Sequence, residues 1–198
     1  MIGTLWRQRS RPGVGSGEWF REWAKRGWTC PGLVGFVWRV GWLRWRGAAV
    51  GAGVMVSRIK TEGSLRRLKI GDGSFVGRAE IQLHAEVEIG TRVCINDGVR
   101  LITGSHEVRD PHWRGIARGI QIGDHAWIAT GAIILPGVKI GRGAVVGAGG
   151  VVAREVPEFA LAVGNPVVIR LDARCRELDY SPTMFLGCTS AWGPGRRK

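Results

Sequence analysis

Residues 122–157 read, in successive groups of six, IGDHAW IATGAI ILPGVK IGRGAV VGAGGV VAREVP. Every group begins with Ile or Val, and its second to fourth residues are mostly glycine or polar. The fifth residues are all small or β-branched: Ala126, Ala132, Val138, Ala144, Gly150 and Val156. A six-residue period of this composition is typical of a β-helix, in which each group forms one flat side of a triangular prism.

The repeat has a direct physical interpretation. The aliphatic residue points into the prism, the fifth residue is small because the inside of a corner is crowded, and glycine supplies the positive φ of the turns. Three groups make one coil, and the coils stack as parallel strands about 4.8 Å apart. A period of six with glycine in most groups is unfavourable for an α-helix. We therefore expect an all-β fold, a parallel β-helix.

The same frame occurs earlier in the chain. It is found in IGDGSF from Ile70, LHAEVE from Leu83 and IGTRVC from Ile89, with an isolated echo, VGAGVM, from Val50. Between the group that begins at Val76 and Leu83 the spacing indicates one inserted residue.

Length and composition limit the alternatives. The 198 residues suffice for one domain, and the 32 glycines occur without the period of collagen. An excess of 29 Lys and Arg over 16 Asp and Glu predicts a polyanionic partner, such as nucleic acid, lipid headgroups or a phosphorylated cofactor. Four cysteines without regular spacing indicate neither a zinc site nor a disulfide framework, so we expect a reducing, cytoplasmic setting without a transmembrane anchor.

One long interruption of the repeat is the candidate for chemistry. Leu101 and Ile122 are 21 residues apart where one group would need six, so residues 102–121 must leave the prism as a loop. This loop contains two of the four histidines of the chain, His106 and His112. Long excursions from a rigid scaffold commonly carry function.

The order of motifs from residue 70 to residue 170 resembles that of the hexapeptide-repeat O-acetyltransferases, which include the maltose, galactoside, nodulation-factor and colanic-acid enzymes. The motifs are LITGSHEVRDP in the loop, the repeats that follow it, and the closing GNPVVIR. The resemblance implies left-handed coils, a homotrimer with active sites between neighbouring prisms, acetyl-CoA as donor and no metal. It also implies that His106 is the general base that activates a sugar hydroxyl, and imidazole has the pKa that this task needs.

The resemblance carries over further site residues. It implies contacts of the donor with Trp127, Thr130, Ala148, Gly149, Ala153, Arg154 and Arg170. Trp127, outward as the sixth residue of its group, could instead cover a subunit interface, and Ala148 and Gly149 could simply form a corner. GNPVVIR is one residue shorter than the usual closing motif and lacks its first basic residue, which puts the phosphate contact of Arg170 in doubt. Asn96 and Glu107 are candidates for binding the acceptor, although Asn also stabilises corners and a lone carboxylate is commonly just solvated.

We expect three segments. Residues 1–47 contain seven of the ten tryptophans interspersed with arginine, residues 48–171 form the β-helix, and residues 172–198 form a basic tail. The first segment either caps the open end of the prism or makes a peripheral contact with the inner face of the plasma membrane.

Two other functions are compatible with parts of the pattern. A γ-type carbonic anhydrase has the same fold and would take zinc through His84, His106 and His112, although their spacing does not favour it. A non-enzymatic scaffold would use the basic charge, but no nucleic-acid recognition motif is present, so we expect no nucleic-acid partner. The acceptor stays open among glycans, small glycosides and antibiotics, with a polymer or lipid-linked glycan preferred.

Overall fold

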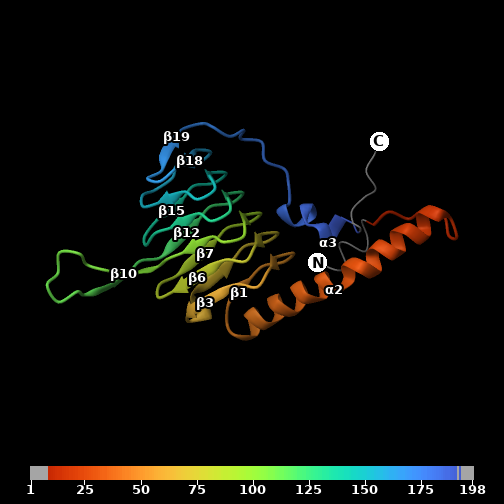
Figure 1. Cartoon of the computed structure of the whole chain (residues 1–198), viewed down its shortest axis with the longest axis horizontal. Coiled ribbons are helices and arrows are strands. Elements are labelled where there is room, and N and C mark those ends of the chain that lie inside the picture. The colour runs from red at the N-terminus through yellow and green to blue at the C-terminus, as the bar shows by residue number, and fades with distance from the viewer. Residues whose placement is uncertain (1–8, 191, 193–198) are drawn as a thin grey trace.

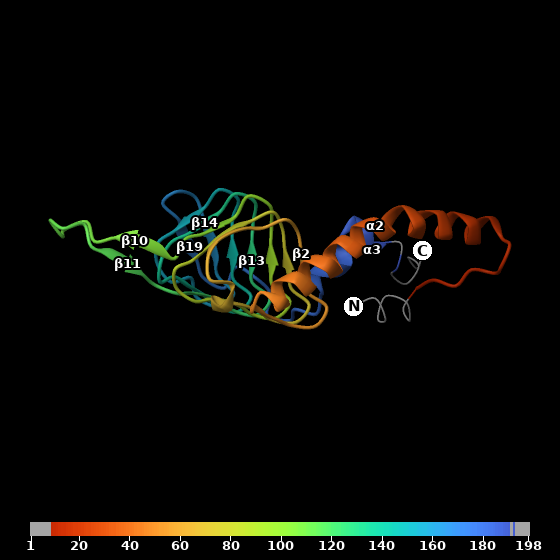
Figure 2. The same ribbon diagram turned by 90° about the horizontal axis from the view of Figure 1, so that it is seen from below.

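The computed structural model describes residues 9–190 and 192; residues 1–8 of the expected first segment, and residues 191 and 193–198 of the tail, lie outside the described residues. The chain forms a prism of short strands, with a long helix at one end and a hairpin that projects away from the prism (Figures 1 and 2). The expected all-β solenoid with an excursion loop is confirmed, and the N-terminal cap, expected to be irregular or helical, is a helix.

Three sheets form the sides of the described prism, and successive strands of the chain belong to successive sheets. Sheet A contains β1 (Ala49–Val50), β4 (Leu68–Ile70), β7 (Val87–Ile89), β12 (Ile120–Ile122) and β15 (Lys139–Ile140). Sheet B contains β2 (Met55–Val56), β5 (Phe75–Val76), β8 (Cys94–Ile95), β13 (Trp127–Ile128), β16 (Val145–Val146), β18 (Leu161–Val163) and β19 (Val168–Arg170). Sheet C contains β3 (Lys60–Gly63), β6 (Glu80–Leu83), β9 (Arg100–Leu101), β14 (Ile133–Ile134) and β17 (Val151–Val152). All neighbours in these sheets pair in parallel except β18 and β19, which are antiparallel.

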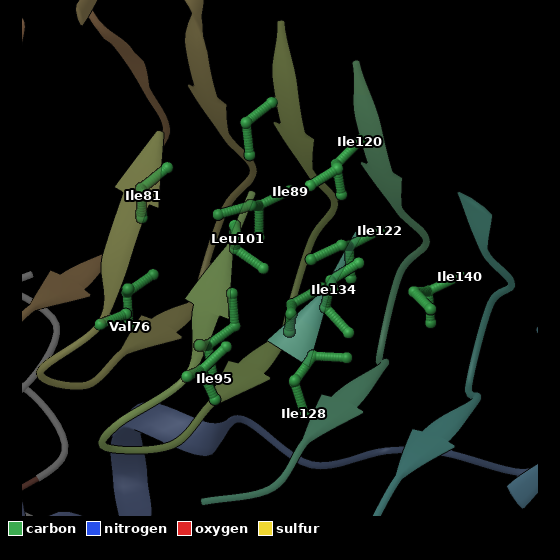
Figure 3. Packing of buried hydrophobic residues seen from close by; sticks show 14 of the residues in the cluster. Val76, Ile81, Ile89, Ile95, Leu101, Ile120, Ile122, Ile128, Ile134 and Ile140 are labelled. Carbon is green, nitrogen blue, oxygen red and sulfur yellow. The ribbon is translucent and has the colours of Figure 1, made fainter. Parts of the chain in front are cut away.

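The core consists of the aliphatic ladders that the repeat predicts. Ile128, Ile134 and Val146 are completely buried, and the small fifth residues Ala126 and Ala132 are buried at the corners. Figure 3 shows side chains of the three sheets, among them Ile122, Ile128 and Leu101, converging inside the prism. Because each coil buries its apolar side chains against the next, the prism is stabilised along its whole length.

The VGAGVM segment is part of a complete coil, although in the sequence it appears as an isolated repeat. The VGAGVM segment from Val50 connects β1 to β2, and β3 follows in the third sheet to complete a full coil. The inserted residue expected before Leu83 coincides with a four-residue strand, β6, in which Ile81 and Leu83 are both buried.

The long helix α2 (Gly17–Trp45) covers the end of the prism at the first coil. Ser16 caps its N-terminus by accepting a hydrogen bond from the Trp19 N–H. Near its C-terminus Val40 and Leu43 join the main core, whereas its N-terminal half extends beyond the prism (Figure 2). No described helix is long and apolar enough to cross a bilayer.

The segment after β19 returns along the prism to α2 (Figure 1). On the way the Arg174 guanidinium donates hydrogen bonds to the carbonyl oxygens of His125 (2.9 Å) and Gly143 (3.0 Å). The short helices η2 (Pro182–Phe185) and α3 (Gly187–Ser190) follow, and Trp192 packs with Leu33 of α2 and Met55 of β2. One further short helix, η1 (Leu65–Arg67), precedes β4. The tail thus ties the two ends of the prism together.

Candidate active site

The excursion loop is a hairpin whose base is fixed to the prism. Strands β10 (Gly104–His106) and β11 (Gly115–Ala117) pair in antiparallel fashion, with His106 opposite Gly115. At the base, the buried Thr103 hydroxyl donates to the Gln82 carbonyl (3.0 Å) and accepts from the His84 N–H (3.1 Å). These bonds to the preceding coil position the first residues of the hairpin.

His106 is exposed and held in one orientation by Trp113 of the same hairpin. Its Nδ1 lies 2.8 Å from the Trp113 carbonyl oxygen, and its ring stacks on the Trp113 indole with centroids 3.7 Å apart and planes 8° apart. A carbonyl oxygen can only accept, so Nδ1 must carry the proton. The lone pair of the neutral imidazole is therefore on Nε2, which is the arrangement of a general base.

An open depression of about 420 Å³ lies beside His106. It is lined by Gln82, His84, Gly104, Ser105, His106, Gly115, Ile116 and Ala117. The His84 ring lies so close to Gly104 that a Cβ there would approach its Cδ2 to 2.7 Å, so a larger residue at this position would displace the ring. The Gln82 Oε1 atom is buried and has no hydrogen-bond partner in the described part of the chain. A buried amide oxygen of this kind favours a ligand that donates a hydrogen bond.

A second group of predicted residues lies at the corner between sheets B and C. Thr130 and Gly149 occupy this corner in consecutive coils, joined by a hydrogen bond from the Gly149 N–H to the Thr130 carbonyl (2.9 Å). Ala148 precedes Gly149 at the same corner. Gly149 has φ 66°, and no heavy atom lies within 4 Å of the position that a Cβ would take. The corner therefore exposes bare backbone, against which an extended substrate arm can lie.

Comparison with known proteins identifies the family. The family model of bacterial transferase hexapeptides (six repeats) matches residues 119–154. The putative colanic acid biosynthesis acetyltransferase WcaF of Escherichia coli K12 is 35% identical over 134 residues, which cover 67% of this chain and 73% of that protein. The chain belongs to the hexapeptide-repeat acetyltransferases.

Solved structures of this family share the fold. A hexapeptide-repeat acetyltransferase from Vibrio cholerae superposes with a TM-score of 0.65 at 25% identity, covering 85% of this chain and 97% of that one. A maltose O-acetyltransferase from Clostridium difficile 630 superposes with a TM-score of 0.55 at 29% identity, covering 65% and 71% of the two chains. The prediction of an acetyltransferase is thus confirmed.

In this acetyltransferase most of the predicted site residues lie either on the hairpin or on sheet B and its corner with sheet C. Trp127 is 42% exposed on sheet B, and its indole N–H donates to the Asn96 Oδ1 atom (2.9 Å). Asn96, predicted to bind the acceptor, thus lies with the predicted donor residues, and its amide nitrogen is the group left to face a ligand. Glu107 follows His106 on the hairpin, where its N–H donates to the Arg114 carbonyl (2.9 Å).

The remaining predicted donor residues lie further along the acetyltransferase prism. Ala153 and Arg154 follow β17 at the next corner, where Arg154 is exposed. Arg170 ends β19 opposite Leu161, at the end of sheet B remote from α2. The structure does not bring Arg170 together with the hairpin.

Sequence reasoning missed three residues around His106. The sequence pattern assigns no role to Gln82 or Trp113, and it offers His84 only as a possible zinc ligand. The available signal was the inserted residue before Leu83, which lengthens β6 where Gln82 lies. Across the described residues, no three His, Cys, Asp or Glu side chains are grouped in a way that could hold a metal ion.

The thiols of the acetyltransferase allow a pH-dependent prediction. Burial raises the pKa of Cys94 to about 11, an effect that the charge of Arg174 opposes, whereas Cys30 and Cys175 are exposed. At pH 8 only about one Cys94 in 10³ is a thiolate, which is the reactive form. We expect maleimide to label Cys30 and Cys175 rapidly and Cys94 roughly 100-fold more slowly, with the rate at Cys94 rising up to about pH 11. Peptide mass spectrometry over time measures this, and equal rates at Cys94 and Cys175 would contradict it.

Proposed function

We propose that this acetyltransferase transfers the acetyl group of acetyl-CoA to a hydroxyl of a sugar or glycan, with His106 as general base. The observation that carries the proposal is the hydrogen bond from Nδ1 of His106 to the Trp113 carbonyl, which leaves the Nε2 lone pair free beside the depression. Nε2 takes the hydroxyl proton while the hydroxyl oxygen attacks the thioester carbonyl. The C–S bond then breaks, and the imidazolium returns the proton to the leaving thiolate.

We propose the depression beside His106 as the acceptor site. Within the described residues the buried Gln82 Oε1 atom has no hydrogen-bond donor, and a sugar hydroxyl would supply one. The exposed His84 and Ser105 side chains add polar groups to the depression. Glu107, next to His106, and the Asn96 amide nitrogen are further proposed contacts of the acceptor. The name of the Escherichia coli relative, which refers to colanic acid biosynthesis, supports a glycan over a small alcohol.

The donor would lie along the exposed corner formed by Thr130, Ala148 and Gly149, with Trp127 and Arg154 beside it. The Vibrio cholerae protein has also been solved in complex with acetyl-CoA. The bare backbone at Gly149 fits the pantetheine arm, because such an arm is extended and makes most of its polar contacts through amide groups. Arg170, remote from the hairpin, would contact a terminal phosphate.

We place the enzyme in the cytoplasm and propose that it acts as a homotrimer. The hairpin projects from the prism and leaves His106 exposed on one side, as expected if a neighbouring prism completes the site (Figure 1). Sedimentation equilibrium tests the trimer, since a particle of one 21.6 kDa chain would contradict it.

The proposed reaction is tested by the release of free thiol from acetyl-CoA in the presence of different acceptors. The panel would contain free sugars, oligosaccharides, lipid-linked glycans and an aminoglycoside. We expect release that depends on a hydroxyl-bearing glycan and yields an O-acetyl ester by mass spectrometry. If acetyl-CoA does not bind at all in calorimetry, the proposal is wrong.

A further inference from the structure

The outer face of α2 is apolar along its whole length. Residues spaced three or four apart lie on one face of a helix. On the face of α2 turned away from the prism these residues are Phe20, Ala24, Gly27, Pro31, Val34, Trp38, Trp42 and Trp45, the outer stripe, and all eight are exposed. Trp38 is 68% and Trp45 is 79% exposed. The stripe contains no charged residue and follows a helix about 43 Å long.

The opposite face of α2 explains why the outer stripe is left uncovered. Leu33, Val40 and Leu43 are buried against the prism and the returning tail. The C-terminal half of the helix therefore has two apolar faces, of which the fold uses one. A single exposed apolar residue needs no explanation, but a continuous stripe of this length indicates a partner.

Cationic side chains follow one edge of the outer stripe. Arg21 and Arg46 occupy this edge, and the Arg46 guanidinium lies over the Trp42 ring, 5.5 Å from its centroid. Arg39 also lies on this edge, but its Nε donates a hydrogen bond to the Val56 carbonyl of the prism (2.7 Å). The whole chain carries a formal net charge of +13. An apolar face edged by arginine suits a surface that is apolar inside and anionic outside.

The composition of the outer stripe favours lipid over another helix. Tryptophan indoles, with an apolar body and one N–H, are well suited to the boundary between headgroups and acyl chains. A seam between two helices needs side chains that interlock at regular positions along its length. Here the small residues Gly27 and Pro31 lie in one half of the stripe, and its three tryptophans are all in the other half. We propose that the outer stripe of α2 lies in the interface of a membrane with anionic lipid headgroups, with the helix parallel to the surface. This site is separate from the proposed acetyl-transfer site.

The proposal is tested by flotation of the full-length protein with vesicles. One set of vesicles is phosphatidylcholine alone, and the other contains about one third phosphatidylglycerol. We expect recovery with the anionic vesicles, weakened by high salt, and a fall of at least about tenfold in partitioning for the double variant Trp38→Ser, Trp45→Ser. Both tryptophans are exposed, so the variant should keep its fold, which circular dichroism checks.

A matched control removes apolar side chains at the other end of the prism. Val168 and Leu171 are 63% and 68% exposed near the end of sheet B remote from α2, and Val168→Ser, Leu171→Ser should float like the unchanged protein. Failure of the unchanged protein to float would overturn the proposal. It would also be overturned if the tryptophan variant lost self-association in sedimentation velocity without lipid, because a second copy would then be the partner. Equal recovery with both kinds of vesicle would overturn the choice of an anionic surface.

Discussion

Replacement of His106 by alanine is expected to lower kcat/KM for acetyl transfer about 10² to 10⁴-fold while the protein stays folded. The substitution removes the Nε2 lone pair, and no other described histidine is oriented by Trp113 beside the depression. A sugar hydroxyl is a weak nucleophile at neutral pH, so loss of the base acts mainly on kcat. Initial rates of thiol release with the acceptor found in the panel measure the effect.

The matched control for this variant is His112→Ala. His112 is exposed in the same hairpin, and only its backbone N–H is engaged, with the Asp110 carboxylate (2.9 Å). We expect it to keep activity within about twofold, because the side chain takes part in no step of the proposed reaction. Calorimetry with CoA should show unchanged binding in both variants, since the exposed corner at Gly149 is untouched. Full activity of His106→Ala would show that another group is the base.

The prism could be predicted from sequence because its rule is local. Whether a side chain such as Ile128 or Trp127 points inward or outward depends on its place within a group of six and on nothing further away. For the same reason the hairpin was found by counting: residues 102–121 do not fit the period. His106 came from the family resemblance, since no local pattern distinguishes it from His112.

The details around His106 could not be predicted because they join separate segments. Gln82 and Thr103 are 21 positions apart and meet only when two coils stack, where the Thr103 hydroxyl donates to the Gln82 carbonyl. The stack of His106 on Trp113 depends on the hairpin register. Such contacts leave no periodic signal in one sequence.

The N-terminal helix was ambiguous for a different physical reason. The C-terminal half of α2 is apolar on both faces, so the sequence there lacks the one-sided pattern from which a surface helix is usually recognised. The cap interpretation describes the face with Val40 and Leu43, and the membrane interpretation describes the outer stripe. The two hypotheses concern different faces, and one does not exclude the other.

Replacement of Ile134 by alanine is expected to lower the free energy of unfolding by about 2–5 kcal/mol, a large part of the roughly 5–15 kcal/mol of a typical domain. Ile134 is completely buried on β14 of sheet C, between Leu101 and Val152 of the adjacent coils, so the cavity would remove contacts on both sides. Ile133 is the matched control, since it has the same side chain on the same strand but faces outward and is only half-buried. Replacement of Ile133 by alanine should lower the free energy of unfolding by less than half as much, because this side chain buries less apolar surface. Guanidinium denaturation of the two variants measures the difference. Equal losses of unfolding free energy in the two variants would mean that the outward face of β14 is packed as tightly as the core. Such packing would require a close contact between neighbouring prisms.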